Sequence, residues 1–328
     1  MNLFRRFKYY AKRGGFLFAL VMGFHSVFLH DRHENGSRLW QKFYNYFLTL
    51  PPEQYEDELR QQLHLIIPNG QKYNIDNPAT FNDKIQWLKL HDYSPIKTTL
   101  ADKYAVRQWV KDTIGEEYLI PLVGGPWKCG EEIDFDKLPS QFVIKANHGS
   151  GEVIIVRNKA QIDRQAIIKT VNQWVNVLYG WFGMESHYFS IPRKIFAEGL
   201  IEQKNGDLVD YKIHCFNGKP QIIQIIGNRD LLKHSALEAF FDTDWNRIPL
   251  MYHSYEQYTT PPQKPGCLDE MIQTAKILSS GFRYVRVDLY EIEGTVKFGE
   301  MTFTPFAGFG RWDNPDYNAI VGSMIKLN

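Results

Sequence analysis

The stretch Phe142-Val-Ile-Lys-Ala-Asn-His-Gly-Ser-Gly151 says most about how this chain folds, because an apolar strand runs through a lysine into a glycine loop. The apolar run Val153-Ile-Ile-Val156 follows, so we expect a hairpin closed by that loop. Backbone N–H groups of a glycine loop bind phosphate oxygens, and Lys145 can place a charge beside them. The lysine precedes the glycines, which excludes a Walker loop. A solvated lysine at a strand end is the alternative interpretation.

A hairpin predicted near the C-terminus supplies acidic residues. The runs from Tyr284 to Tyr290 and from Val296 to Phe303 flank Glu293-Gly294. With a loop of three residues, Asp288 faces Glu300 across the hairpin. With a loop of two residues, the acids point to opposite faces, and the sequence leaves both arrangements open.

Two carboxylates on one face need a positive charge between them. At about 5 Å and an effective dielectric near 20 they repel by about 3 kcal/mol. Mg²⁺ is the natural occupant, since one or two carboxylates plus substrate phosphates usually hold it. The same register brings Arg286 opposite Thr302. Asp288 and Glu300, together with the glycine loop, therefore predict a site for ATP and Mg²⁺.

A second hairpin is predicted at Asn217-Gly218, which separates an alternating run from the apolar stretch Ile222 to Ile226. An Asn-Gly pair between such runs is typical of a type I′ turn. The polar face of the first run presents Asp210, Lys212 and His214 together. Lys212 can neutralise charge on a transferring phosphoryl group. An exposed strand with salt-bridged ends is the alternative.

Composition limits the classes of function. A chain of 328 residues predicts about two domains. Its 38 basic and 37 acidic residues nearly cancel, so we expect no nucleic-acid partner. Cys129, Cys215 and Cys267 are scattered and lack metal-ligand spacing, which favours a reducing, cytoplasmic setting.

Residues 1–30 carry the one strong charge asymmetry, because five basic residues precede the first acid, Asp31. The apolar run from Phe16 to Leu29 is too short to span a bilayer and lacks a small-residue cleavage site. We therefore expect neither a membrane span nor a signal peptide. Two interpretations remain open: peripheral contact with an anionic membrane at its inner face, or a helix packed on the protein body.

Hydrophobic periodicity and capping signals predict helices over residues 54–65, 81–90, 101–114, 164–178 and 271–280. Thr80 is the expected N-cap of the second of these. The resulting architecture is α+β. A basic, largely helical segment (1–77) precedes an N-terminal lobe with the glycine loop (78–195) and a C-terminal lobe with the metal site (196–328).

Taken in order, these pieces resemble the ATP-grasp superfamily between about residues 100 and 305, in which two α+β lobes with antiparallel sheets clamp a nucleotide. Glu198-Gly-Leu-Ile201 is similar to the hinge whose backbone meets the adenine edge, and Asp210-Tyr-Lys212 resembles the Asp-x-Arg/Lys strand. The resemblance implies cofactor-binding roles for Lys103, Lys145, His148, Gly149, Ser150, Gly151, Glu198, Gly199, Ile201 and Asp210. It implies metal ligation by Asp288, Glu300 and Thr302, and catalytic roles for Arg286 and Lys212.

A closer resemblance, over most of residues 78 to 310, is to the TupA-like ATP-grasp group found with bacterial surface-polysaccharide synthesis. Its motifs are Phe81-Asn-Asp-Lys-Ile-Gln-Trp-Leu-Lys89, Asp102-Lys-Tyr-Ala-Val-Arg107, Ile114-Gly-Glu-Glu-Tyr-Leu-Ile-Pro121, Lys145-Ala-Asn-His-Gly-Ser-Gly151 and Glu300-Met-Thr-Phe303. Thr302 departs from the superfamily, where an asparagine commonly helps to bind metal or phosphate, which puts a second Mg²⁺ in doubt. Glu202 and Asp207 are the candidates for the ribose-binding acid.

The resemblance implies an ATP-dependent ligase that forms an amide through an acyl phosphate. The expected acceptor is a uronic acid or similar carboxylate saccharide, and the expected amine is an amino acid or amino sugar. Two other functions use parts of the same chemistry. A sugar kinase would need a general base such as Asp210 or His214. A glycosyltransferase would need an Asp-x-Asp pair, for which only Asp242-Thr-Asp244 has the spacing, in a turn-rich segment.

Overall fold

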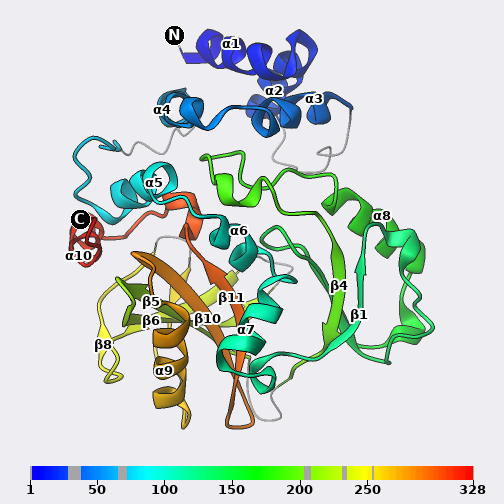
Figure 1. Cartoon of the computed structure of the whole chain (residues 1–328), viewed down its shortest axis with the longest axis vertical. Coiled ribbons are helices and arrows are strands. Elements are labelled where there is room, and N and C mark those ends of the chain that lie inside the picture. Colours follow the sequence, from blue (N-terminus) through cyan, green and yellow to red (C-terminus); the bar gives the residue numbers. More distant parts are fainter. Residues whose placement is uncertain are drawn as a thin grey trace.

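A computed structural model describes residues 2–28, 38–65, 72–202, 208–230, 235–252 and 255–327. A layer of helices lies at one end of the long axis, and two β-sheets lie beyond it (Figure 1). One sheet has four strands and the other has seven. Short 3₁₀ turns connect these elements at Pro52–Gln54, Glu116–Tyr118, Gly130–Glu132, Lys159–Gln161, Ser186–Tyr188 and Pro305–Gly308.

The helical layer has an aromatic core. It contains α1 (Asn2–Gly14), α2 (Phe16–Phe28), α3 (Arg38–Leu48) and α4 (Tyr55–Leu65). Phe18 and Phe43 are fully buried and stack at 4.5 Å between ring centroids. Arg13 points inward and pairs with buried Glu58 at 2.5 Å. The helix predicted up to residue 65 is confirmed, and α1 is packed on the body through one of its faces.

The next three helices are α5 (Phe81–His91), α6 (Pro95–Ala101) and α7 (Val106–Ile114). Thr80 caps α5 as predicted, in a capping box with Asp83. The helix predicted over 101–114 is confirmed from Val106 to Ile114, but its predicted start is wrong, because α6 ends at Ala101 and a turn follows. Asp102 Oδ1 accepts hydrogen bonds from the backbone N–H groups of Tyr104 (2.8 Å) and Ala105 (3.0 Å), which closes a turn between α6 and α7.

The four-stranded sheet has the order β1-β4-β2-β3. Its strands are β1 (Leu122–Trp127), β2 (Phe142–Ala146), β3 (Val153–Val156) and β4 (Ile195–Gly199). Phe142 faces Val156, so the predicted hairpin around the glycine loop is confirmed. Helix α8 (Arg164–Trp174) covers this sheet and ends before residue 178, the predicted end. Its Ile167 and Val171 pack with Ile144.

The seven-stranded sheet has the order β11-β10-β5-β6-β7-β8, with β9 paired to β7. Its elements are β5 (Asp210–Phe216), β6 (Lys219–Asp230), β7 (Ser235–Phe241), β8 (Arg247–Ile248), β9 (Glu256–Gln257), β10 (Tyr284–Ile292) and β11 (Thr295–Thr302). Asn217 (φ 52°) and Gly218 (φ 74°) form the β5–β6 turn, as a type I′ turn requires.

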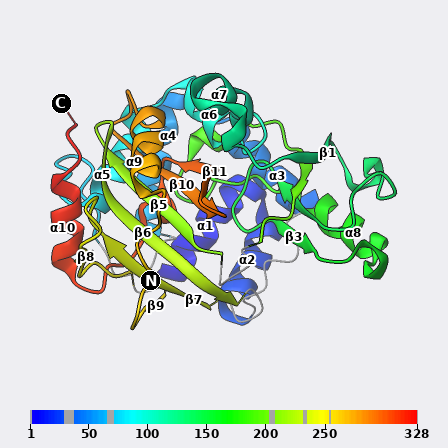
Figure 2. The ribbon, with the colours of Figure 1, turned by 90° about the horizontal axis from the view of Figure 1, so that it is seen from below.

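Helices cover both sides of the seven-stranded sheet. Helix α9 (Leu268–Leu278) lies along one face (Figure 2), and α7 packs into the same core. Helix α10 (Pro315–Ser323) packs against α5 near the other face. Thus α5 to α7 precede the four-stranded sheet in sequence but pack on the seven-stranded one. The domain boundaries at residues 78 and 196 stay predictions.

The last hairpin decides between the two loop lengths that the sequence left open. Its loop has two residues, Glu293 (φ 51°) and Gly294 (φ 78°), rather than three, because Ile292 pairs with Thr295. Such a loop alone would put the acids on opposite faces. A bulge after Asp288 shifts the register by one residue at Gly299, so Asp288 still pairs with Glu300. A Cβ at Gly299 would lie 3.0 Å from the Asp288 carbonyl oxygen.

Candidate functional site

The seven-stranded sheet has two chemically different faces. On the apolar face, Ile213 and Val287 are fully buried under α9. On the opposite, charged face lie the polar side chains that alternate with them. Paired residues of neighbouring strands share a face, so the register alone places these side chains together. The charged face comprises Lys212, Gln224, Glu238, Arg286, Asp288, Glu300 and Thr302.

Asp288 is the centre of the ion pairs on the charged face. It accepts a hydrogen bond from Lys212 Nζ, and Arg286 binds it in a bidentate manner at 2.7 and 2.8 Å. Arg286 Nη2 also lies 3.4 Å from Glu300 Oε1 and donates to Thr302 Oγ1 at 3.1 Å. The two predicted catalytic residues and the three predicted metal ligands therefore form one connected group.

The opposite side of the site is built by the β2–β3 hairpin. Lys145 Nζ donates to Glu198 Oε2 on β4 at 2.6 Å, and Glu198 Oε1 accepts from Arg107 at 2.6 Å. Burial of Glu198 (5% exposed) explains why two cations gather around it. Sequence reasoning quoted Arg107 in a motif but gave it no role.

The glycine loop follows Lys145 and is anchored at its start. The Asn147 side chain donates to the Pro192 carbonyl at 3.0 Å and accepts from the Lys194 backbone N–H at 2.8 Å. Gly151 has φ +89°, which favours glycine, and a Cβ there would meet no heavy atom within 4 Å. The tip of the loop therefore stands in open space, where a phosphate can approach its backbone.

Lys103 connects the two sides. It lies in the turn between α6 and α7, and its backbone N–H donates to the Asn147 carbonyl at 2.9 Å. Its Nζ donates to the Gly149 carbonyl and lies 3.2 Å from Glu300 Oε2. One cation thus contacts both the glycine loop and the last hairpin. The two stretches that the sequence predicted to form a single site meet through this side chain.

The electrostatics of the site favour anionic ligands. Burial alone would raise the pKa of Glu300, but Lys103, Lys212 and Arg286 outweigh it and hold the pKa well below its usual range. Burial would lower the pKa of Arg286, but Asp288 raises it above its ordinary value. Both groups are therefore charged at neutral pH. Three cations surround two carboxylates here, which leaves an excess of positive charge.

The oxygens of Asp288 and Glu300 fit the role of Mg²⁺ ligands. They are hard oxygen donors on paired positions of one hairpin, which is the ligand type that Mg²⁺ prefers. Among the residues that the structure describes, no group of three or more His, Cys, Asp or Glu side chains is suited to hold a metal. Two carboxylates completed by phosphate oxygens match the usual Mg²⁺ site in nucleotide enzymes.

Other predicted cofactor-binding residues lie on or just beyond strands of the two sheets. Gly199 and Ile201 end and follow β4. Asp210 pairs with Arg229. The ribose candidate Glu202 pairs with Arg157, and Asp207 lies outside the described residues.

His148 and His214 are both buried, and their rings contact other parts of the protein. His148 is 3% exposed, and its ring contacts backbone groups of Trp174 and Val177 at the end of α8. Burial lowers the pKa of His148 to about 4, so the ring is neutral at pH 7. The cofactor-binding role predicted for His148 stays a prediction, and the ring itself packs against the end of α8. His214 is 2% exposed and contacts Tyr284 Oη at 2.8 Å and Gln224 Oε1 at 3.3 Å.

The segment between α8 and β4 was missed by sequence reasoning. Tyr179 hydrogen-bonds to Ser150 of the glycine loop, and Glu185 accepts from Thr304 Oγ1 at 2.5 Å just beyond β11. Lys89 of α5 donates to the Gly183 carbonyl at 2.7 Å in the same segment. The sequence predicted a helix only up to residue 178, so only the folded chain reveals that residues 179–185 contact the glycine loop and the end of the last hairpin.

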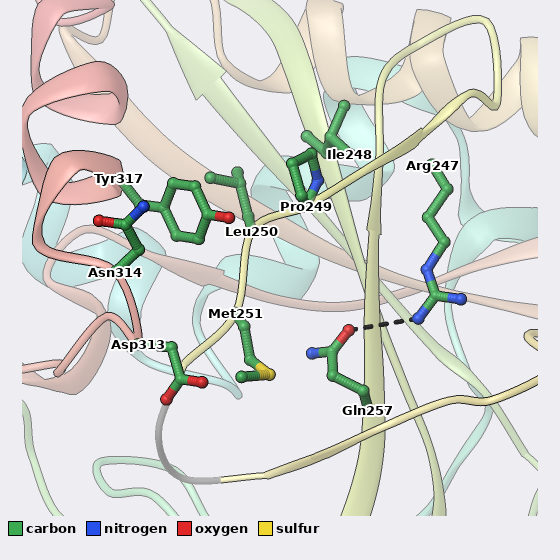
Figure 3. Close-up of a pocket in the computed structure, with 9 residues that line it drawn as sticks. All are labelled: Arg247, Ile248, Pro249, Leu250, Met251, Gln257, Asp313, Asn314 and Tyr317. Atoms are coloured by element: carbon green, nitrogen blue, oxygen red, sulfur yellow. Dashed lines mark hydrogen bonds between the residues drawn. The ribbon is translucent and has the colours of Figure 1, made fainter.

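A separate cavity of about 570 Å³ lies between β8 and α10 (Figure 3). Its lining residues are Arg247, Ile248, Pro249, Leu250, Met251, Gln257, Asp313, Asn314 and Tyr317. Arg247 donates to the Tyr258 carbonyl at 2.7 Å and lies 3.3 Å from Gln257 Oε1. None of the predicted site residues lines this cavity, so we assign the functional site to the charged face.

Comparisons with known proteins bear on the family of the chain. The model of the TupA-like ATPgrasp family matches residues 83–326. No curated protein matches the chain.

Several solved structures are similar at low identity. They include D-alanine–D-alanine ligase from Bacillus anthracis complexed with ATP (16% identity, TM-score 0.34, 62% of this chain and 54% of that chain covered). Another is the Helicobacter pylori D-alanine–D-alanine ligase (13%, 0.38, 76% and 70%). A third is the ATP-grasp ligase PsnB with a minimal precursor (12%, 0.34, 64% and 54%). The matched region spans about half of the Bacillus and PsnB chains.

Proposed function

The chain belongs to the TupA-like ATP-grasp family, and from this premise we propose that it is an ATP-dependent ligase that joins a carboxylate to an amine. The observation that carries the proposal is the position of Lys103, which contacts both Gly149 and Glu300. A phosphate-binding loop and a pair of acids thereby share one cation. This arrangement suits a triphosphate held between the two sheets.

The proposed reaction has two steps. A carboxylate oxygen of the acceptor attacks the γ-phosphorus of ATP, which forms an acyl phosphate and releases ADP. The amine nitrogen then attacks the acyl carbon, the C–N bond forms, and inorganic phosphate leaves with the C–O electron pair. The amine gives up a proton to solvent. Most of the catalysis in such a step is positioning and charge stabilisation.

The residues of the site fit these demands. A carboxylate and a triphosphate are both anionic, so they approach only where cations lie between them. Lys145 at the glycine loop and Lys212 and Arg286 on the charged face supply those cations. Asp288 and Glu300 would hold Mg²⁺, which neutralises phosphate charge when bound. Thr302 would add a hydroxyl oxygen beside Glu300.

We propose a uronic-acid-containing surface polysaccharide, or its precursor, as the acceptor, and an amino acid or amino sugar as the amine. The support is the resemblance of the motifs to the group associated with polysaccharide synthesis, together with the excess of cations over carboxylates. The reaction is placed in the cytoplasm, where ATP is available. The described helices include none with the length and apolar character needed to cross a membrane.

The competing functions find less support. A sugar kinase would need Asp210 or His214 as a general base. Asp210 is paired with Arg229, and both ring nitrogens of His214 lie within hydrogen-bonding distance of Tyr284 and Gln224. Asp242 of the Asp-x-Asp sequence closes a turn by accepting from the backbone of residues 244 and 246. Its spacing is explained by that turn.

The test is a screen for ADP release with the full-length protein, Mg²⁺-ATP and uronic-acid saccharides, each offered with and without amino acids or amino sugars. We expect ADP release that depends on both partners, and an amide product by mass spectrometry. Lys145→Ala should weaken ATP binding by about 10- to 100-fold through loss of a charge-assisted contact. Lys169→Ala, an exposed lysine on α8, is the matched control. A stable phosphoester without an amine requirement would instead establish a kinase.

A further inference from the structure

Helices α1 and α2 have an exposed surface whose side chains differ from those on their buried faces. Their inward residues join the aromatic core, but four large apolar side chains point out: Phe4 and Phe16 are 67% exposed, Leu17 is 59% and Leu20 is 37% exposed. The cations Arg5, Lys8 and Lys12 are exposed on α1 as well. The basic-apolar surface is defined as Phe4, Arg5, Lys8, Lys12, Phe16, Leu17 and Leu20.

The geometry of the two helices makes this surface continuous. Residues 4, 8 and 12 recur every fourth position and so form one stripe on α1. Phe7 packs edge-on against Phe16 at 5.5 Å, which brings the stripes of α1 and α2 together. Lys8 Nζ lies 4.7 Å from the ring centroid of Phe4. Cations and apolar groups are thus interleaved rather than separated.

The positive charge of this surface indicates what kind of partner can bind it. Residues 1–30 contain no acid, and the inward cation Arg13 is already neutralised by Glu58. A second copy of the chain on a two-fold axis would bring Arg5, Lys8 and Lys12 against their own counterparts, which repel. An anionic bilayer offers both a negative surface and an apolar interior for the four large side chains.

The surface is also connected to the site. The aromatic core of α1 to α4 includes Leu178, Met184 and Phe189 from the segment between α8 and β4. The same segment contacts the glycine loop through Tyr179 and the end of β11 through Glu185. Figure 1 shows α1 at the far end of the long axis with the sheets beyond α3 and α4. A membrane bound at α1 therefore lies at the end of the molecule where this segment joins the helical layer to the site.

We infer that the basic-apolar surface of α1 and α2 docks the protein on an anionic phospholipid membrane, and that its carboxylate acceptor is a saccharide carried by a membrane lipid. The first part stands on the surface alone. The second part rests on the proposed ligase function. Docking would keep the protein at the membrane surface and raise the local concentration of lipid-attached acceptors.

The docking test is co-sedimentation of the full-length protein with phosphatidylcholine vesicles, with and without phosphatidylglycerol. The charge variant replaces Arg5, Lys8 and Lys12 by glutamine, and the apolar variant carries Phe16→Gln and Leu17→Gln. A matched control replaces the exposed Lys128, Lys169 and Lys276 by glutamine. We expect binding only with phosphatidylglycerol, a loss on the order of 100-fold in the charge variant, and no change in the control.

Several results would overturn the docking proposal. They are sedimentation of the charge variant like wild type, equal binding to neutral vesicles, or a dimer in solution that the apolar variant abolishes. Circular dichroism and thermal unfolding check that each variant folds.

The acceptor test compares ADP release with a uronic acid in solution and the same uronic acid on a lipid in anionic vesicles. We expect faster turnover on vesicles, and the charge variant should lose that advantage while keeping its rate in solution. Equal rates on both forms would refute the lipid-carried acceptor. If neither form supports ADP release while co-sedimentation holds, the ligase proposal fails and membrane docking stands.

Discussion

The two faces of the seven-stranded sheet are formed by the same strands but carry different side chains, apolar on one face and charged on the other. On the apolar face, Ile213 and Val287 are buried beneath α9. On the charged face, Lys212 and Asp288 on the same two strands pair with each other. Along one strand, alternate side chains therefore have different roles. One is buried in the apolar core, and the next carries a charge on the opposite face. We expect the two faces to respond to mutation in different assays.

The largest expected effect is on the charged face. Lys212→Met keeps the length of the side chain but removes its charge, so turnover should fall by about 10²- to 10⁴-fold. The fold should survive, because Arg286 still binds Asp288 through two hydrogen bonds. Steady-state kinetics and urea unfolding measure the two effects. An unchanged turnover would remove Lys212 from the site.

Ile213, the residue next to Lys212 on β5, tests the apolar face. Ile213→Ala leaves a cavity in a fully buried position and should lower the free energy of unfolding by about 3 kcal/mol. Turnover at temperatures well below the unfolding transition should stay close to wild type. If Ile213→Ala slowed turnover as much as Lys212→Met, the two faces would not be separable, and the comparison between them would fail.

The smallest effect concerns Glu238, a carboxylate on the charged face with 0% exposure. Burial raises its pKa to about 7, against the hydrogen bonds from Gln224 and the backbone of Tyr252. Since the folded pKa exceeds the unfolded value of about 4.3, the contribution is present below that value and is lost as pH rises through about 7. Between about pH 5 and about pH 7 the free energy of unfolding should fall by about 2.7 kcal/mol, at about 1.36 kcal/mol per pH unit.

The measurement is the free energy of unfolding between about pH 5 and about pH 8 for the wild type and for Glu238→Gln, which cannot ionise. The difference between the two curves isolates this one group from the other acids. Parallel curves would show that Glu238 ionises normally in the folded protein.

Local sequence patterns predicted much of the arrangement of strands and turns around the site. The alternation along β5 predicted which side chains share a face, and Asn217-Gly218 predicted the turn that ends it. The strand, lysine and glycines from Phe142 to Gly151 predicted the hairpin and its loop. These signals depend on the steric preferences of a few neighbouring residues, and such preferences can be predicted from the sequence alone.

The meeting of the two sides was decided by tertiary structure. The bulge at Gly299 sets which acids face each other. An isolated glycine inside a strand can mark a bulge, but it does not fix how the two strands pair. The break after Ala101 places Lys103 between the glycine loop and Glu300, where sequence predicted a continuous helix. The contacts of Lys103 with Gly149 and Glu300 join residues far apart in the chain, whose energies repay the cost of closing long loops only in the complete fold.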